Sequence, residues 1–273
     1  MDEMKVRTPR FDFSNTRARW SPVPEFAQMM NASSLWIPHL ERFLNRVLAK
    51  ALTELKGDDE KTRQLRRDVR TFIRQEANHY TLHGAFNEAV KRDGYDLEPF
   101  EKYFAEQFDE LLATRSLPFL CAYCEGFETL GPPAAVMWLD RVASLTEGAD
   151  PEVVGLWKWH LVEEYEHRTV CFDVFKAIHG GYFLRLKGFF FQLKQLGGFS
   201  KMVRKHLFET DYANMSSSEI RASKKRLKQV SRKLAMATLP RLAKALSPFY
   251  TPRNAQEPVN WRAQRAIIEA NLA

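Results

Sequence analysis

Apolar residues recur at intervals of three and four along most of this 273-residue chain, and the strict alternation of a half-buried strand is nearly absent. The pattern predicts an all-α protein. Gly57, Gly131 and the pair Gly180–Gly181 separate the helices, and Asp150 followed by Pro151 is a typical helix start. The predicted helices cover residues 33–57, 61–91, 97–115, 118–131, 134–145, 151–180, 182–196, 216–239 and 260–272.

Two of these helices carry the same chemical motif, Glu-x-x-His. It occurs as Glu76 and His79 in "EANH" and as Glu164 and His167 in "EYEH". Residues three apart lie on one side of a helix, so each motif offers a carboxylate and an imidazole in the same direction. A single Glu-x-x-His motif in a helix arises readily by chance. A four-helix bundle with a dinuclear metal centre has two, together with one glutamate from each of two further helices.

The helices that precede the two motifs supply candidates for these further glutamates. Glu41 lies among apolar residues in the first, and Glu125 lies deep in the apolar run "PFLCAYCEGF" of the second. A carboxylate in apolar surroundings is costly unless it is paired or binds a metal ion. We therefore prefer Glu125 as the fourth glutamate, with Glu128 as the alternative.

The stretch "WHLVEEYEH" holds further candidate ligands. His160 lies four residues before Glu164, and at about 100° per residue it shares a helical face with Glu164 and His167. Glu163 is an alternative ligand or a hydrogen-bond partner of a ligating histidine, and His83 is either such a partner or a core histidine. The predicted metal ligands are Glu41, Glu76, His79, Glu125, His160, Glu164 and His167.

The net charge of +7 is concentrated in the C-terminal third. Residues 181–250 contain fifteen lysines and arginines but three acidic residues, and aromatic residues lie between the basic ones. We divide the chain into a metal-binding bundle, residues 1–180, and a basic helical extension that packs on it, residues 181–273. Two interpretations explain this charge: the basic side chains lie on solvated helix faces, or they bind an anionic membrane surface. Nucleic acid is not an expected partner, because no recognition motif accompanies the charge.

Compartment and assembly are also constrained by the sequence. No apolar run approaches the roughly 20 residues that a membrane span needs, and "MDEMKVRTPRFDF" lacks the apolar core of a signal peptide. Three cysteines suit reduced thiols better than a disulfide framework. We expect a cytoplasmic protein, with membrane association through the basic extension as an alternative, and a homodimer among its assembly states.

Four stretches resemble bacterial proteins described as predicted metal-dependent hydrolases, which carry a ferritin-like ligand pattern: "NASSLWIPHLERFLNRVL", "VRTFIRQEANHYTLHGAFN", "AYCEGFETL" and "LWKWHLVEEYEHRTVCFDVF". The resemblance spans roughly residues 31–180 and implies a ferritin-like four-helix bundle with additional C-terminal helices. The order of the candidate ligands is also similar to that of the di-iron p-aminobenzoate N-oxygenases, although the sequences are otherwise distant.

Carboxylate and imidazole ligands without a thiolate suit iron or manganese. We therefore expect two iron ions, with manganese as the alternative. The leading interpretation is a non-haem di-iron oxygenase or oxidase that uses O₂ and an electron donor to oxidise a small apolar or aromatic molecule. The alternative is a metal-dependent hydrolase whose dinuclear centre activates water. A non-catalytic metal-binding or membrane-surface protein is the third interpretation.

Overall fold

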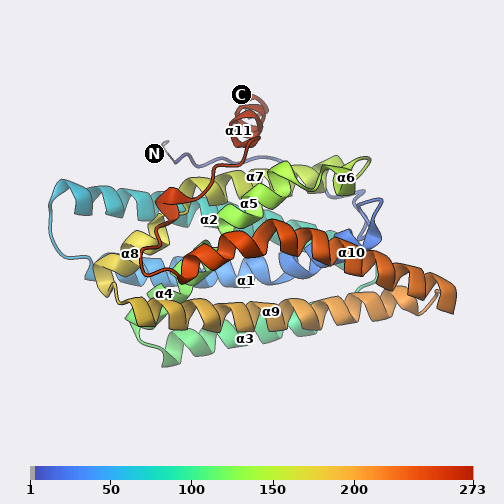
Figure 1. The fold of residues 1–273 in the computed structure, drawn as a ribbon, viewed down its shortest axis with the longest axis horizontal. Helices are drawn as coiled ribbons and strands as arrows, with labels where there is room; N and C mark the ends of the chain where they lie inside the picture. Colours follow the sequence, from blue (N-terminus) through green and yellow to red (C-terminus); the bar gives the residue numbers. More distant parts are fainter. Residues whose placement is uncertain (1–3, 273) are drawn as a thin grey trace.

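The computed structural model describes residues 4–272, and all regular secondary structure in this range is helical (Figure 1). The prediction of an all-α protein is confirmed. The helices are α1 (Pro24–Glu54), α2 (Glu60–Arg92), α3 (Glu98–Thr114), α4 (Leu117–Glu128), α5 (Gly131–Asp140), α6 (Ala143–Thr146), α7 (Pro151–His167), α8 (Val170–Ile178), α9 (Tyr182–Tyr212), α10 (Ser217–Leu242) and α11 (Trp261–Ala270), with 3₁₀ turns η1 (Ala243–Leu246) and η2 (Pro252–Asn254).

The first helix begins earlier than predicted, at Pro24, so that Pro38 lies inside it rather than near its first turn. A proline has no N–H and therefore leaves the carbonyl four residues earlier, that of Ser34, without its helical donor. The side chain of Asn87 on α2 donates to this carbonyl across 3.1 Å. The hydrogen bond from α2 allows α1 to continue through the proline and to carry Glu41 one turn further on.

The helix predicted over 151–180 is divided into α7 and α8, and the one predicted to end at 196 continues to Tyr212. At the first break, the side chain of Arg168 donates a hydrogen bond to the carbonyl of Tyr165. At the predicted end near residue 196, the glycine pair Gly197–Gly198 does not end α9, because the flanking Leu196 and Phe199 are buried in the core. Burial of apolar side chains thus outweighs the low helix propensity of glycine.

α9 packs against α1 and α4, and its approach to α4 depends on two glycines (Figure 1). A Cβ atom on Gly188 would lie 2.4 Å from the carbonyl carbon of Ala122, and one on Gly126 would lie 2.7 Å from the Cα atom of Phe189. Only glycine fits at such distances. This contact fixes the rotation of α4 and, with it, the direction of its two glutamates.

The N-terminal and C-terminal segments meet on one side of the bundle, next to α7 (Figure 1). An ion pair of 2.9 Å between Arg7 and Glu269 joins them. The C-terminal helix α11 is anchored by Trp261, which is buried and donates from Nε1 to the carbonyl of Val162 on α7. Within residues 4–272, no helix has the length and apolar character needed to cross a membrane.

Candidate metal centre

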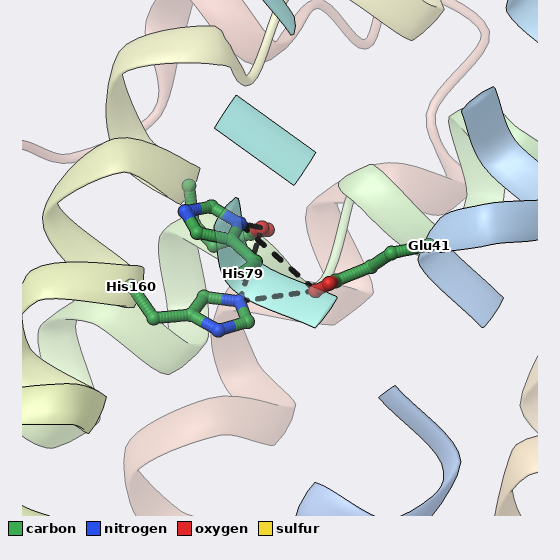
Figure 2. A group of neighbouring side chains, drawn as sticks. Glu41, His79 and His160 are labelled. Carbon is green, nitrogen blue, oxygen red and sulfur yellow. Dashed lines mark ion pairs between the residues drawn. The ribbon is translucent and has the colours of Figure 1, made fainter. Parts of the chain in front are cut away.

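Glutamates and histidines from α1, α2, α4 and α7 meet inside the bundle, where all of them are buried. They form two groups, and within each group the potential ligand atoms lie within 4.8 Å of one another. Glu164 belongs to both groups. Figure 2 shows Glu41 pointing from α1 towards the rings of His79 and His160. The first group is Glu41, His79, His160 and Glu164, and the second is Glu76, Glu128, Glu164 and His167.

The spacing of the motif residues brings their polar atoms together on each helix. On α7, Nε2 of His160 and Nε2 of His167 each lie 3.2 Å from Oε1 of Glu164. Between helices, Nε2 of His160 lies 3.6 Å from Oε1 of Glu41, and Nε2 of His167 lies 3.3 Å from Oε1 of Glu76. The two turns of α7 therefore hold one carboxylate between two imidazoles, and the other helices supply the remaining carboxylates.

Most oxygen atoms of these carboxylates lack a hydrogen-bond partner. Both oxygens of Glu41, Glu76 and Glu128 are buried and unpartnered, as is Nδ1 of His79. Nε2 of His167 lies within 3.3 Å of three carboxylates but carries at most one proton, so it cannot satisfy them all. Buried carboxylates left in this way are strongly destabilising. The residues present therefore fit a pair of divalent metal ions with oxygen and nitrogen ligands.

Each grouped imidazole uses its other nitrogen for a hydrogen bond with a residue outside the two groups. Nε2 of His79 lies 3.1 Å from Oε2 of Glu163, which leaves Nδ1 towards the first group. Nδ1 of His160 lies 2.8 Å from Nε2 of His83, whose Nδ1 lies 2.8 Å from the hydroxyl of Ser34. Such partners fix the tautomer and orientation of a metal-binding histidine.

The third imidazole is held by a longer connection. Nδ1 of His167 lies 3.3 Å from Oε1 of Gln75, whose amide nitrogen donates to Glu166 across 3.3 Å. The buried guanidinium of Arg7 lies 2.8 Å from Glu166 and 3.1 Å from Glu163. One arginine near the N-terminus thus supports the partners of both His79 and His167.

The carboxylates differ in their tendency to ionise. Burial and neighbouring carboxylates raise the pKa of Glu41 well above its ordinary value, and burial and Glu164 raise the pKa of Glu128 to about 8. Burial also opposes ionisation of Glu164, but the rings of His167 and His160 hold its pKa well below the usual range. Of these three carboxylates, Glu164, which belongs to both groups, is therefore the one that ionises most readily.

A family described as predicted metal-dependent hydrolases matches residues 5–256. The chain belongs to this family. No curated protein and no solved structure matches. Membership of the predicted metal-dependent hydrolases agrees with the resemblance seen in the sequence and extends it into the basic extension. The match favours the hydrolase alternative over the di-iron oxygenase, since it supports neither iron nor O₂ chemistry.

The geometry places Glu128, and not Glu125, with the other candidate ligands. Glu125 is buried one turn before Glu128 on α4, where its Oε1 lies 3.4 Å from Arg185 and 3.3 Å from the hydroxyl of Thr129. Burial raises the pKa of Glu125 to about 7, against the opposing effect of Arg185. The geometry therefore favours Glu128, the alternative, over Glu125 as the fourth glutamate. Glu163 and His83 lie behind His79 and His160, as hydrogen-bond partners.

Arg7 and Gln75 were not anticipated from the sequence. Arg7 lies in a non-helical segment, far along the chain from the residues that it contacts. Gln75 precedes Glu76 directly and is fully buried. The adjacent motif was a signal that could have drawn attention to Gln75, whereas nothing in the pattern around Arg7 indicated burial.

A cavity of about 180 Å³ adjoins the first group, and His160 and Glu164 form part of its wall. The rest of the wall is almost entirely apolar and comes from α1, α4, α5 and α7. A cavity of roughly 150 Å³ holds a benzene molecule, so one aromatic ring fits here. Two larger hollows, of about 230 and about 530 Å³, include none of the grouped residues. Of these three, the smallest cavity is the one whose wall includes grouped residues.

Proposed function

We propose that this protein is a hydrolase with a pair of divalent metal ions at its catalytic centre. The observation that carries the proposal is the pair of buried groups that share Glu164 and leave carboxylate oxygens without hydrogen-bond partners. Membership of the predicted metal-dependent hydrolases supports the type of reaction. The proposed ligands are Glu41, Glu76, His79, Glu128, His160, Glu164 and His167.

Two divalent ions held in this way would lower the pKa of a water molecule and stabilise negative charge on a substrate oxygen. The protein orients the ligating side chains and surrounds the centre with apolar residues. Glu163 holds the proton of His79 on Nε2 and keeps Nδ1 free towards the first group, and Glu164 can serve both ions because it belongs to both groups.

The apolar cavity defines the substrate that we propose. Trp36, Phe127 and Trp157 line it, and His160 and Glu164 lie at its wall. A small aromatic or branched apolar group would bury its surface there and bring an attached ester or amide bond beside the centre. The substrate is therefore a small molecule whose hydrolysable bond is joined to an apolar group.

Metal analysis and a hydrolysis assay test this proposal together. Protein purified without oxygen should hold two metal ions per chain, and metal-free protein reloaded with Zn²⁺ or Mn²⁺ should hydrolyse chromogenic esters or anilides of small aromatic acids without O₂. Glu164→Ala should abolish both metal pairing and activity. Two ions without hydrolysis of any such substrate would leave the centre in place and remove the hydrolase assignment.

The second candidate is a di-iron oxidase that uses O₂ and an electron donor. The observation that favours it is the source of the grouped residues: a glutamate from each of α1 and α4, and a Glu-x-x-His motif from each of α2 and α7. Ferritin-like di-iron and di-manganese proteins use this combination. Oxygen consumption on adding Fe²⁺ to metal-free protein, with no hydrolysis by the Zn²⁺ form, would select this candidate.

A further inference from the structure

The outward face of α9 combines exposed aromatic rings with lysines. Phe183 is 84% exposed and Phe190 is 54% exposed, although large apolar side chains are normally covered. At about 100° per residue, six exposed residues fall within an arc of roughly 60°. This α9 stripe consists of Phe183, Lys187, Phe190, Lys194, Lys201 and Lys205.

The α9 stripe is free of opposing charge over most of its length. Lys205 lies 3.8 Å from Glu209, where both side chains are exposed. Lys187, Lys194 and Lys201 form no ion pair with any residue in 4–272, and Lys187 instead lies 5.9 Å from the ring centre of Phe119. At 1.5 Å per residue the stripe is about 33 Å long, so it can contact an extended anionic surface.

The same combination recurs on the next helix. On α10, Met236 is 65% exposed and Leu239 is 61% exposed, and they continue a line of exposed basic residues. The basic residues of this line are Arg221, Lys225, Lys228 and Arg232. Both helices pack against α1 with their opposite sides, which hold buried residues such as Leu196 and Leu234 (Figure 1).

We propose that the α9 stripe is a membrane-docking face that binds the surface of an anionic lipid bilayer. The lysines would lie at the lipid phosphates, and Phe183 and Phe190 would enter the boundary between headgroups and acyl chains. An anionic polymer such as nucleic acid would explain the lysines but not the exposed apolar side chains. Docking is to the surface, since no helix within residues 4–272 can span the bilayer. The proposal does not depend on the hydrolase assignment.

Vesicle co-sedimentation of the full chain tests the proposal. The protein should bind vesicles of mixed phosphatidylglycerol and phosphatidylcholine, bind pure phosphatidylcholine vesicles far more weakly, and be released by high salt. Lys187→Gln combined with Lys194→Gln and Lys201→Gln should weaken binding about 100-fold. Phe183→Ser combined with Phe190→Ser should weaken it at least about tenfold, because the apolar insertion is lost.

A matched control removes the same number of lysines from another surface. Lys50, Lys56 and Lys61 are exposed near the turn between α1 and α2. Their combined replacement by glutamine should leave vesicle binding within about twofold of the parent chain, because they lie outside the α9 stripe. Equal binding by the α9 lysine variant and this control would overturn the proposal. Failure of the parent chain to bind anionic vesicles would also overturn the proposal. So would a result in which the α9 lysine substitutions weaken binding to DNA but not binding to vesicles.

Discussion

Oε2 of Glu163 accepts a hydrogen bond from Nε2 of His79 across 3.1 Å. The two residues come from α7 and α2, and both are fully buried. The bond holds a ring proton on Nε2 and directs Nδ1 towards Glu41 and Glu76. It therefore links the orientation of a candidate ligand to a carboxylate outside both groups.

Glu163→Ala should weaken metal binding at the first group about 10- to 100-fold, because His79 loses the partner that fixes its ring. Glu163→Gln should weaken metal binding less, since the amide oxygen can still accept the hydrogen bond from Nε2 of His79. Competition with a chelator of known affinity measures both. Equal affinity of the alanine variant and the parent chain would show that the ring is held by packing alone.

Arg7→Ala should lower the free energy of unfolding by about 3 kcal/mol, because Glu163 and Glu166 lose a buried cationic partner. The exposed pair of Arg253 and Asp173 provides the control, and Arg253→Ala should cost about 1 kcal/mol or less. Urea denaturation of the metal-free proteins gives both values. If the two substitutions cost the same, the network around Arg7 contributes no more than a surface ion pair.

Glu128→Gln and Glu125→Gln should have different effects on metal content. Glu128 belongs to the second group, so its replacement should reduce bound metal from two ions to one per chain. Glu125 lies beside Arg185, and the amide of glutamine can keep that hydrogen bond, so two ions should remain. Elemental analysis measures the metal content of both variants. Loss of one ion in Glu125→Gln and none in Glu128→Gln would indicate Glu125 as the ligand.

Metal binding at pH 7 should release protons. In the metal-free protein the pKa of Glu128 is raised to about 8, by burial and Glu164. Burial disfavours the charged ring of His79, but Glu163 and Glu76 raise its pKa to about 9. Both groups therefore carry a proton at pH 7 that must leave when a metal ion binds, and metal affinity should increase as the pH rises from 6 to 9.

Calorimetric titration in two buffers with different ionisation enthalpies counts the released protons. Identical heats in both buffers would mean that no proton leaves and that the ligands are already in their metal-binding form at pH 7.

Ala134→Phe should fill the apolar cavity while leaving every grouped residue unsubstituted. We expect kcat/KM for a substrate with an aromatic group to fall at least tenfold, with metal content unchanged. Ala49→Phe, at an exposed position on α1, is the control for the added ring and should leave kcat/KM unaltered. Equal rates for the two variants would place the substrate outside this cavity.

Local regularities were sufficient to predict the all-helical class and most of the candidate centre. The spacing of Glu76 and His79, and of His160, Glu164 and His167, brings their side chains to one face of a helix because the backbone fixes about 100° per residue. Their apolar surroundings indicated burial. These features depend only on residues within two turns of one another, and the structure brings all five into the two groups.

The choice between Glu125 and Glu128 depended on the tertiary structure. Every residue from Phe119 to Glu128 is buried, so the apolar pattern gives α4 no outer face from which to infer its rotation. That rotation is set by the contact of α4 with α9, where Arg185 pairs with Glu125 and thereby separates it from the other carboxylates. The part played by Arg7 was likewise decided by folding, because a contact across more than 150 residues leaves no periodic trace in the sequence.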